Sequence, residues 1–154
     1  MHRYTLIAVL LLSVPGCQSQ PSSGPDPSAG APAVATSTEP VAILRDMQGD
    51  DASLALPGAV LVNAASQTKV NLVPLEVDFE KESVVIVSLG RQPTGHYGVK
   101  INSAQKQGGR LFVQGHALLP QNPAAAPKTP THPFAAAVIP KFQGTVHPEI
   151  TDAP

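Results

Sequence analysis

The seven residues Ser83–Leu89, SVVIVSL, constrain the fold of this chain more than any other stretch. Four consecutive residues in it are β-branched, and such side chains pack well in strands but lose conformational freedom in helices. Because successive side chains of a strand point to opposite faces, an uninterrupted apolar run places apolar groups on both faces. We therefore expect a strand that other parts of the chain cover on both sides.

A second stretch, Val70–Phe79, alternates between apolar and polar residues, which is typical of a half-buried strand. Pro74 lies inside it and indicates a sheet edge or a bend, because proline cannot donate a ladder hydrogen bond. The expected apolar face consists of Leu75, Val77 and Phe79, and the expected acidic face of Glu76, Asp78, Glu80 and Glu82. Such a row of carboxylates favours a solvated face or a protected edge, with calcium binding or catalysis as the alternative.

Three further stretches indicate strands. Tyr97–Ile101 has period two, and Arg110–Gly115 is its expected antiparallel partner across the Gly108–Gly109 turn. Phe134–Pro140 is a short strand or, because of its alanines, a helical turn. The segment 120–133 contains five prolines, which predicts a long loop. Strands at short spacing without helical periodicity predict an all-β fold, either a small β-sandwich or a barrel-like domain.

The first residues have the pattern of a secretion signal. The apolar run Leu6–Val14 is too short to cross a bilayer about 30 Å thick but suits the middle of a signal peptide. The adjoining Val14–Cys17, VPGC, resembles the lipobox of bacterial lipoproteins, which implies that Cys17 is acylated and becomes the new N-terminus. The alternative is cleavage after Ala35, which would leave no anchor. Cys17 is the only cysteine, so it has no disulfide partner within the chain, in agreement with lipid attachment.

The residues that follow the lipobox form a spacer. Ser, Pro, Gly and Ala dominate residues 17–40, and few large apolar side chains are present to offset the entropy of ordering. We expect a flexible tether that holds the domain on the order of 25 to 30 Å from the membrane. The predicted organisation is a signal peptide at 1–16, the lipidated tether at 17–40 and one β-rich domain at 41–154. The lipobox resemblance implies a lipid anchor in the bacterial cell envelope, and Gln18 in place of an aspartate after the cysteine favours the outer membrane if the cell has two membranes.

The composition and motifs of the domain exclude several classes of function. From Val41 onward nine Lys and Arg residues balance nine Asp and Glu residues, so no basic surface favours nucleic acid as a partner. The chain has no Gly-x-Ser-x-Gly motif of a hydrolase and no glycine-rich loop for a nucleotide. The later histidines stand about 15 to 20 residues apart, unlike zinc ligands. We predict a protein that is not an enzyme and binds no cofactor or metal; a hydrolase with an unrecognised site is the remaining alternative.

The turn Pro93–Tyr97, PTGHY, is the candidate site for a protein partner. A rigid turn with a tyrosine and a small residue at its apex offers contact area at little entropic cost. The predicted partner-binding residues are Pro93, Thr94, Gly95, His96 and Tyr97. The alternative is a hairpin with a structural role only, in which Gly95 and Gly98 supply positive φ angles and Tyr97 packs inward.

The same turn carries a family resemblance. The stretch from Val77 to Ile101, VDFEKESVVIVSLGRQPTGHYGVKI, resembles the C-terminal domain of the PrcB family, lipoproteins in which V-D-F, a run of valines and a G-x-r-P-T-G-G-Y turn occur in this order. Thr131–Lys141, THPFAAAVIPK, resembles a later segment of that family. The family commonly has a second glycine where this chain has His96, and an aromatic residue where it has His132. The resemblance implies a non-catalytic subunit that associates with a protease and stabilises it.

A second resemblance is to chagasin-type inhibitors of cysteine proteases, which insert three loops of an immunoglobulin-like sandwich into a protease cleft. Pro93–Tyr97 is similar to the first of these loops, with the order of threonine and glycine altered. Gly108–Gly109 and His132–Phe134 are similar to the other two. This resemblance implies, as the alternative function, an inhibitor of papain-like proteases.

Overall fold

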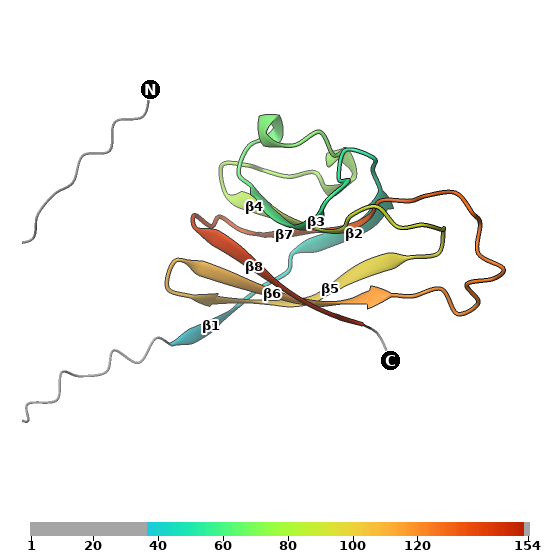
Figure 1. The fold of residues 1–154 in the computed structure, drawn as a ribbon. Helices are drawn as coiled ribbons and strands as arrows, with labels where there is room; N and C mark the ends of the chain where they lie inside the picture. Colours follow the sequence, from blue (N-terminus) through green and yellow to red (C-terminus); the bar gives the residue numbers. More distant parts are fainter. Residues whose placement is uncertain (1–36, 153–154) are drawn as a thin grey trace, which may run out of the picture. The chain divides into compact units, whose positions relative to one another are not determined.

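The domain consists of two four-stranded sheets, shown in Figure 1. A computed structural model describes residues 37–152, and the expected signal peptide and Cys17 lie outside the described residues. The first sheet has the order β1 (Thr38–Val41), β5 (Gly98–Gln107), β6 (Arg110–Leu118) and β8 (Thr145–Asp152). The second sheet has the order β2 (Arg45–Asp50), β7 (Pro133–Pro140), β4 (Glu82–Leu89) and β3 (Pro57–Val62). The prediction of an all-β sandwich is confirmed.

The apolar run Ser83–Leu89 lies in β4, between β3 and β7 in the second sheet. Val85 and Val87 belong to the core between the sheets, whereas Val84 and Ile86 belong to a cluster on the outer face of the second sheet. Both faces of this strand are therefore buried, as predicted. The neighbouring alanines lie in β7, so the strand interpretation of that stretch is correct and the helical turn is wrong.

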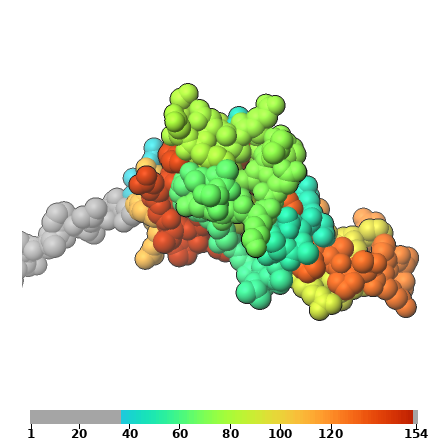
Figure 2. All heavy atoms as spheres, turned by 90° about the horizontal axis from the view of Figure 1, so that it is seen from above, coloured from blue at the N-terminus to red at the C-terminus, as the bar shows by residue number. Residues whose placement is uncertain are grey.

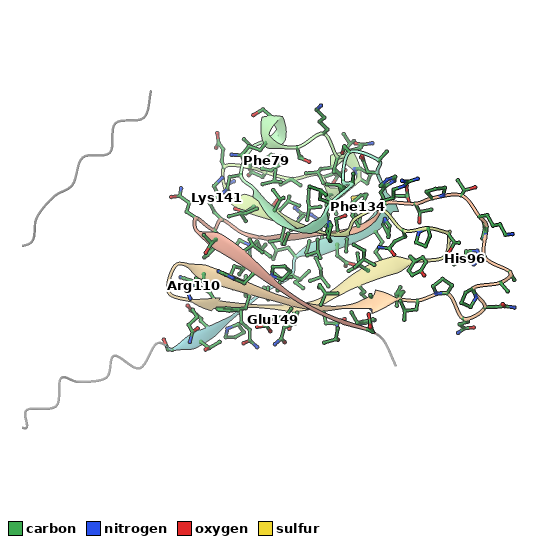
Figure 3. The ribbon with its side chains drawn as sticks, in the orientation of Figure 1. Phe79, His96, Arg110, Phe134, Lys141 and Glu149 are labelled. Carbon is green, nitrogen blue, oxygen red and sulfur yellow. The ribbon has the colours of Figure 1, made fainter. Side chains whose placement is uncertain are left out.

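The outer face of the second sheet is covered by the segment 63–81. This segment contains two short 3₁₀-helices, η1 (Ala65–Gln67) and η2 (Val73–Leu75). Leu75 is buried in the outer cluster, and the half-buried Phe79 packs against it. The Lys141 ammonium group holds the segment 63–81 in place, because it donates hydrogen bonds to the carbonyl oxygens of Phe79 at 2.6 Å and Asn63 at 3.2 Å (Figure 3).

The predicted strand Val70–Phe79 is wrong as an element, although its burial pattern is right. Glu76 has a left-handed φ of 47° directly after η2, and a strand cannot continue through that conformation. Pro74 lies inside η2, where its missing N–H costs nothing. The side chains still alternate: Leu75 is buried, Val77 and Phe79 are half-buried, and Glu76, Asp78 and Glu80 are exposed. The alternation of apolar and polar residues therefore arises because an irregular segment packs onto the sheet.

The expected hairpin is present. β5 and β6 pair antiparallel from Gly98 with Leu118 to Gln107 with Arg110, with a register shift between Ile101 and Ser103. The turn lies at Gly108 and Gly109, as predicted. β8, for which the sequence analysis predicted no strand, runs parallel to β6 and completes the first sheet.

The first strand begins before the expected domain boundary. β1 pairs with β5 from Thr38 to Val41, so residues 38–40 belong to the sandwich and not to the tether. The chain then crosses to the second sheet through residues 42–44, a passage visible in Figure 1. Among the described residues, no helix is long and apolar enough to span a membrane.

Candidate partner-binding site

Two loops lie side by side at one end of the sandwich, and we call residues 90–97 and 119–132 the loop tip (Figures 1 and 2). Gln92 and Thr131 exchange two main-chain hydrogen bonds: the Gln92 N–H donates to the Thr131 carbonyl at 2.7 Å, and the Thr131 N–H donates back at 3.1 Å. The Gly95 N–H donates to a carbonyl of the second loop at 2.8 Å. The predicted turn and the proline-rich loop therefore form one surface.

Gly95 and Thr94 hold the two loops together. Gly95 is buried, and a Cβ atom added there would lie 3.4 Å from the Pro127 ring. The Pro127 carbonyl is the acceptor of the Gly95 N–H. The Thr94 carbonyl accepts a hydrogen bond of 3.0 Å from the Thr131 hydroxyl. These two predicted site residues thus build the framework of the loop tip through their main chains.

Pro93 and His96 are exposed, and Tyr97 is half-buried. His96 has a φ of 68°, in the left-handed region that few non-glycine residues occupy. Neither Gly95 nor Gly98 has a positive φ, so the purely structural alternative is wrong on that point. The turn therefore presents Pro93 and His96 outward while Gly95 faces the second loop.

The loop tip carries positive charge and no carboxylate. Residues 90–97 and 119–132 contain neither Asp nor Glu. Arg91 and Lys128 are both exposed, and the loop tip also contains the imidazole side chains of His96 and His132. At neutral pH this surface is cationic, although the whole domain is close to neutral.

The base of the second loop is fixed to the end of β2. The Asp50 carboxylate accepts a hydrogen bond of 2.7 Å from the His132 N–H, and the Asp51 N–H donates to the His132 carbonyl at 3.1 Å. The Ser53 N–H donates to the Asp51 carboxylate at 2.8 Å. Hydrogen bonds from the Ser53 side chain and N–H, with a smaller effect of His132, lower the pKa of Asp51, although burial acts in the opposite direction.

The acidic residues before β4 form a turn and not a row on a strand. The Asp78 carboxylate accepts a hydrogen bond of 3.1 Å from the Glu80 N–H and lies 3.3 Å from the Lys81 ammonium nitrogen. These interactions lower the pKa of Asp78. The Glu82 carboxylate accepts a hydrogen bond of 3.0 Å from the Asp78 N–H and forms an ion pair of 2.5 Å with Arg45. These carboxylates are engaged in stabilising the turn.

The histidines of β6 and β8 have separate surroundings. His116 Nδ1 lies 2.9 Å from the side-chain nitrogen of Asn102, and the His147 ring stacks on Phe112 with centroids 5.4 Å apart. Within residues 37–152, no group of three or more His, Cys, Asp and Glu side chains could hold a metal ion.

The three segments that resemble inhibitor loops do not converge. Pro93–Tyr97 precedes the first residue of β5, whereas Gly108–Gly109 follows its last. A strand of ten residues separates the two turns by roughly 30 Å at about 3.3 Å per residue. Phe134 is buried against Gly49 in the outer cluster. This arrangement disfavours the insertion of all three segments into one protease cleft.

The sequence predicts a loop at 120–133 and no site residue within it. The structure brings Pro127 and Thr131 of this segment into the candidate site. The available signal was the density of prolines, because proline restricts the backbone and gives a loop a defined shape without a ladder of hydrogen bonds.

Comparison with known proteins relates part of the chain to a family. Residues 83–140 match the family model described as PrcB C-terminal. No curated protein and no solved structure matches the chain. The matched segment runs from β4 to β7 and includes both loops of the loop tip. The resemblance inferred from the sequence is thereby confirmed: residues 83–140 are similar to the C-terminal domain of PrcB, a family whose name points to association with a protease complex.

Proposed function

We propose that this chain is a lipid-anchored protein of the bacterial cell envelope whose domain binds a protein partner through the loop tip and performs no catalysis. The partner is a protease or another envelope protein, which the domain associates with and stabilises. Cys17 carries the lipid, and the residues after it tether the domain to the membrane. In a cell with two membranes the anchor lies in the outer one.

The observation that carries this proposal is the joining of two loops into one fixed surface. Main-chain hydrogen bonds link Gln92 with Thr131 and Gly95 with Pro127, so both loops are restrained before any partner arrives. Restraint reduces the entropy lost on binding, which is a main cost of recognition by loops. The family match supports the same assignment, because it spans both loops.

The charge of the loop tip defines the kind of partner surface. Arg91, Lys128 and His96 are exposed without a carboxylate in either loop. A cationic surface attracts an acidic protein surface and repels a basic one. This charge complementarity makes binding more specific and raises the association rate. The loop tip therefore suits an acidic patch on the partner protein.

The cationic surface can be tested by capture of the partner. The full chain, isolated from envelopes in mild detergent, should retain severalfold less partner when it carries His96→Asn together with Lys128→Ala, since hot spots concentrate binding energy in few residues. Arg110→Ala is the matched control, because Arg110 is an exposed cation at the opposite end of β5 (Figure 3). Equal capture by the double variant and the control would place the partner surface elsewhere. Inhibition of papain by the unmodified chain would favour the inhibitor function instead.

The anchor requires a separate test. Cys17→Ser should abolish labelling by a fatty-acid analogue and leave the precursor unprocessed, because the serine hydroxyl cannot replace the thiol as acyl acceptor. Labelling and membrane fractionation would be compared with those of the unmodified chain. Unchanged labelling in the variant would refute the assignment of Cys17.

A further inference from the structure

The edge strand β3 has a free side. It is the last strand in the order β2-β7-β4-β3 and pairs with β4 from Pro57 to Val62. Within residues 37–152 no strand pairs with its other side. Backbone N–H and C=O groups on such a side form a template for another chain, so an open edge calls for an explanation.

The other three sheet edges carry protecting residues. Natural proteins protect edge strands with charges, prolines or short length, because these oppose pairing with another chain. The protecting residues are Glu39 and Pro40 in β1, Arg45, Asp46 and Asp50 in β2, and Pro148, Glu149 and Asp152 in β8. β3 has only Pro57, at its first position, so the strand from Gly58 to Val62 is unprotected.

Apolar hollows lie on both faces of the second sheet beside this edge. On the outer face, a hollow of about 440 Å³ is lined in part by Leu54, Val60 and Ile86. Toward the first sheet, a hollow of about 250 Å³ is lined in part by Val87 and Ile150. An added strand projects alternate side chains to the two faces of the sheet. Residues of β3 line both hollows, so a strand placed against β3 would project side chains next to them.

The surroundings of the edge define the chemistry of that strand. Residues 52–68 contain no Asp, Glu, Lys, Arg or His, and they lie over one face of the molecule in Figure 2. Leu56 is 82% exposed and Val60 is 51% exposed. The occupant is therefore an extended, uncharged, aliphatic strand, because a charge buried here would have no partner of opposite sign.

We propose that β3 pairs in antiparallel orientation with β3 of a second copy of this chain. Strand pairing needs an open edge on both partners, and the structure supplies such an edge on every copy. A two-fold axis makes the contact self-complementary and closed, and it places the exposed Val60 of each copy opposite Val60 of the other. The two second sheets then form one continuous sheet.

Cysteine crosslinking in cells tests this pairing on the membrane-processed full chain. Val60 lies at the centre of the free stretch, so two-fold pairing brings the two copies of this residue together. Val60→Cys should give a disulfide-linked species of twice the mass on mild oxidation. Val73→Cys is the matched control, because Val73 is an 80% exposed valine outside β3, and it should give none.

A second measurement covers the case in which the cysteine variant folds poorly. Two differently tagged copies of the full chain should co-isolate, and Val60→Lys should reduce co-isolation about tenfold because it places like charges at the shared axis. Val73→Lys should leave co-isolation unchanged. Co-isolation that survives Val60→Lys, or a Val60→Cys adduct with a different protein and none with a second copy, would overturn the proposal.

Discussion

His96 adopts a left-handed φ of 68° at the position where the resembled family commonly has glycine. Histidine is among the few non-glycine residues that are enriched in this region, so the backbone of the turn is kept. The exchange adds an exposed imidazole to a surface that glycine would leave bare. Compared with glycine, histidine at this position adds a side chain to the surface and keeps the left-handed backbone conformation.

Substitutions at position 96 separate conformation from recognition. His96→Asn should change the free energy of unfolding by less than about 0.5 kcal/mol, because asparagine tolerates a positive φ. His96→Val should cost about 1 to 2 kcal/mol, since a β-branched residue is strained there. Chemical denaturation of both variants is the measurement. Equal stability of the two would show that φ is not positive at this residue.

Asp51 gives the loop base a dependence on pH. Its pKa lies below the ordinary value of 3.8, so the stabilisation is fully present above that value and is lost as the pH falls through the lower pKa of the folded state. Asp51→Asn should therefore reduce stability at pH 7 by less than about 1 kcal/mol, and the difference should shrink as the pH falls below the ordinary pKa of 3.8. Ser53→Ala should reproduce part of this effect, because it removes one of the hydrogen bonds. Unfolding curves across this pH range would contradict the account if the difference grew on acidification.

At the scale of elements, β4 was predictable because its signal is local. Its consecutive β-branched residues project to both faces, so both faces of the strand must be buried whatever its position in the sheet. Val70–Phe79 was not predictable, because the alternation of a half-buried strand also arises in an irregular segment packed on a sheet. β8 was missed because its burial alternates weakly and its parallel pairing with β6 is a long-range feature. Local patterns predicted β4 and the β5–β6 hairpin, whereas the long-range pairing of β6 with β8 could not be predicted.

The burial of β4 in the core between the sheets can be tested by one substitution. Val85 is 1% exposed in the core between the sheets, so Val85→Asp buries an unpaired carboxylate and should cost several kcal/mol of a total of about 5 to 15. Circular dichroism should show loss of the strand signal. Val73→Asp, at an exposed valine, should leave the spectrum intact. A folded Val85→Asp variant would contradict the assignment of β4 to the core.

At the scale of the whole molecule, the sandwich places the loop tip and the β5–β6 turn at opposite ends of β5. The sequence predicts Pro93–Tyr97 as a candidate site from local residues alone. It could not show that residues 127 and 131 complete the surface, because more than 30 residues separate the two loops and their contact depends on the pairing of β4 with β7 as well as that of β5 with β6. The residues of the turn can thus be found from the local sequence, whereas the contact between the two loops depends on long-range strand pairing.

Site-specific photocrosslinking in living cells tests the central claim most directly. A photoreactive residue would replace His96 or Lys128 in the loop tip or, as the control, Arg110 at the other end of β5. Binding through the loop tip predicts that positions 96 and 128 yield an adduct with the same protein and that position 110 does not. Correctly processed, folded variants that give no adduct from either position of the loop tip, or give that same adduct from position 110, would contradict it.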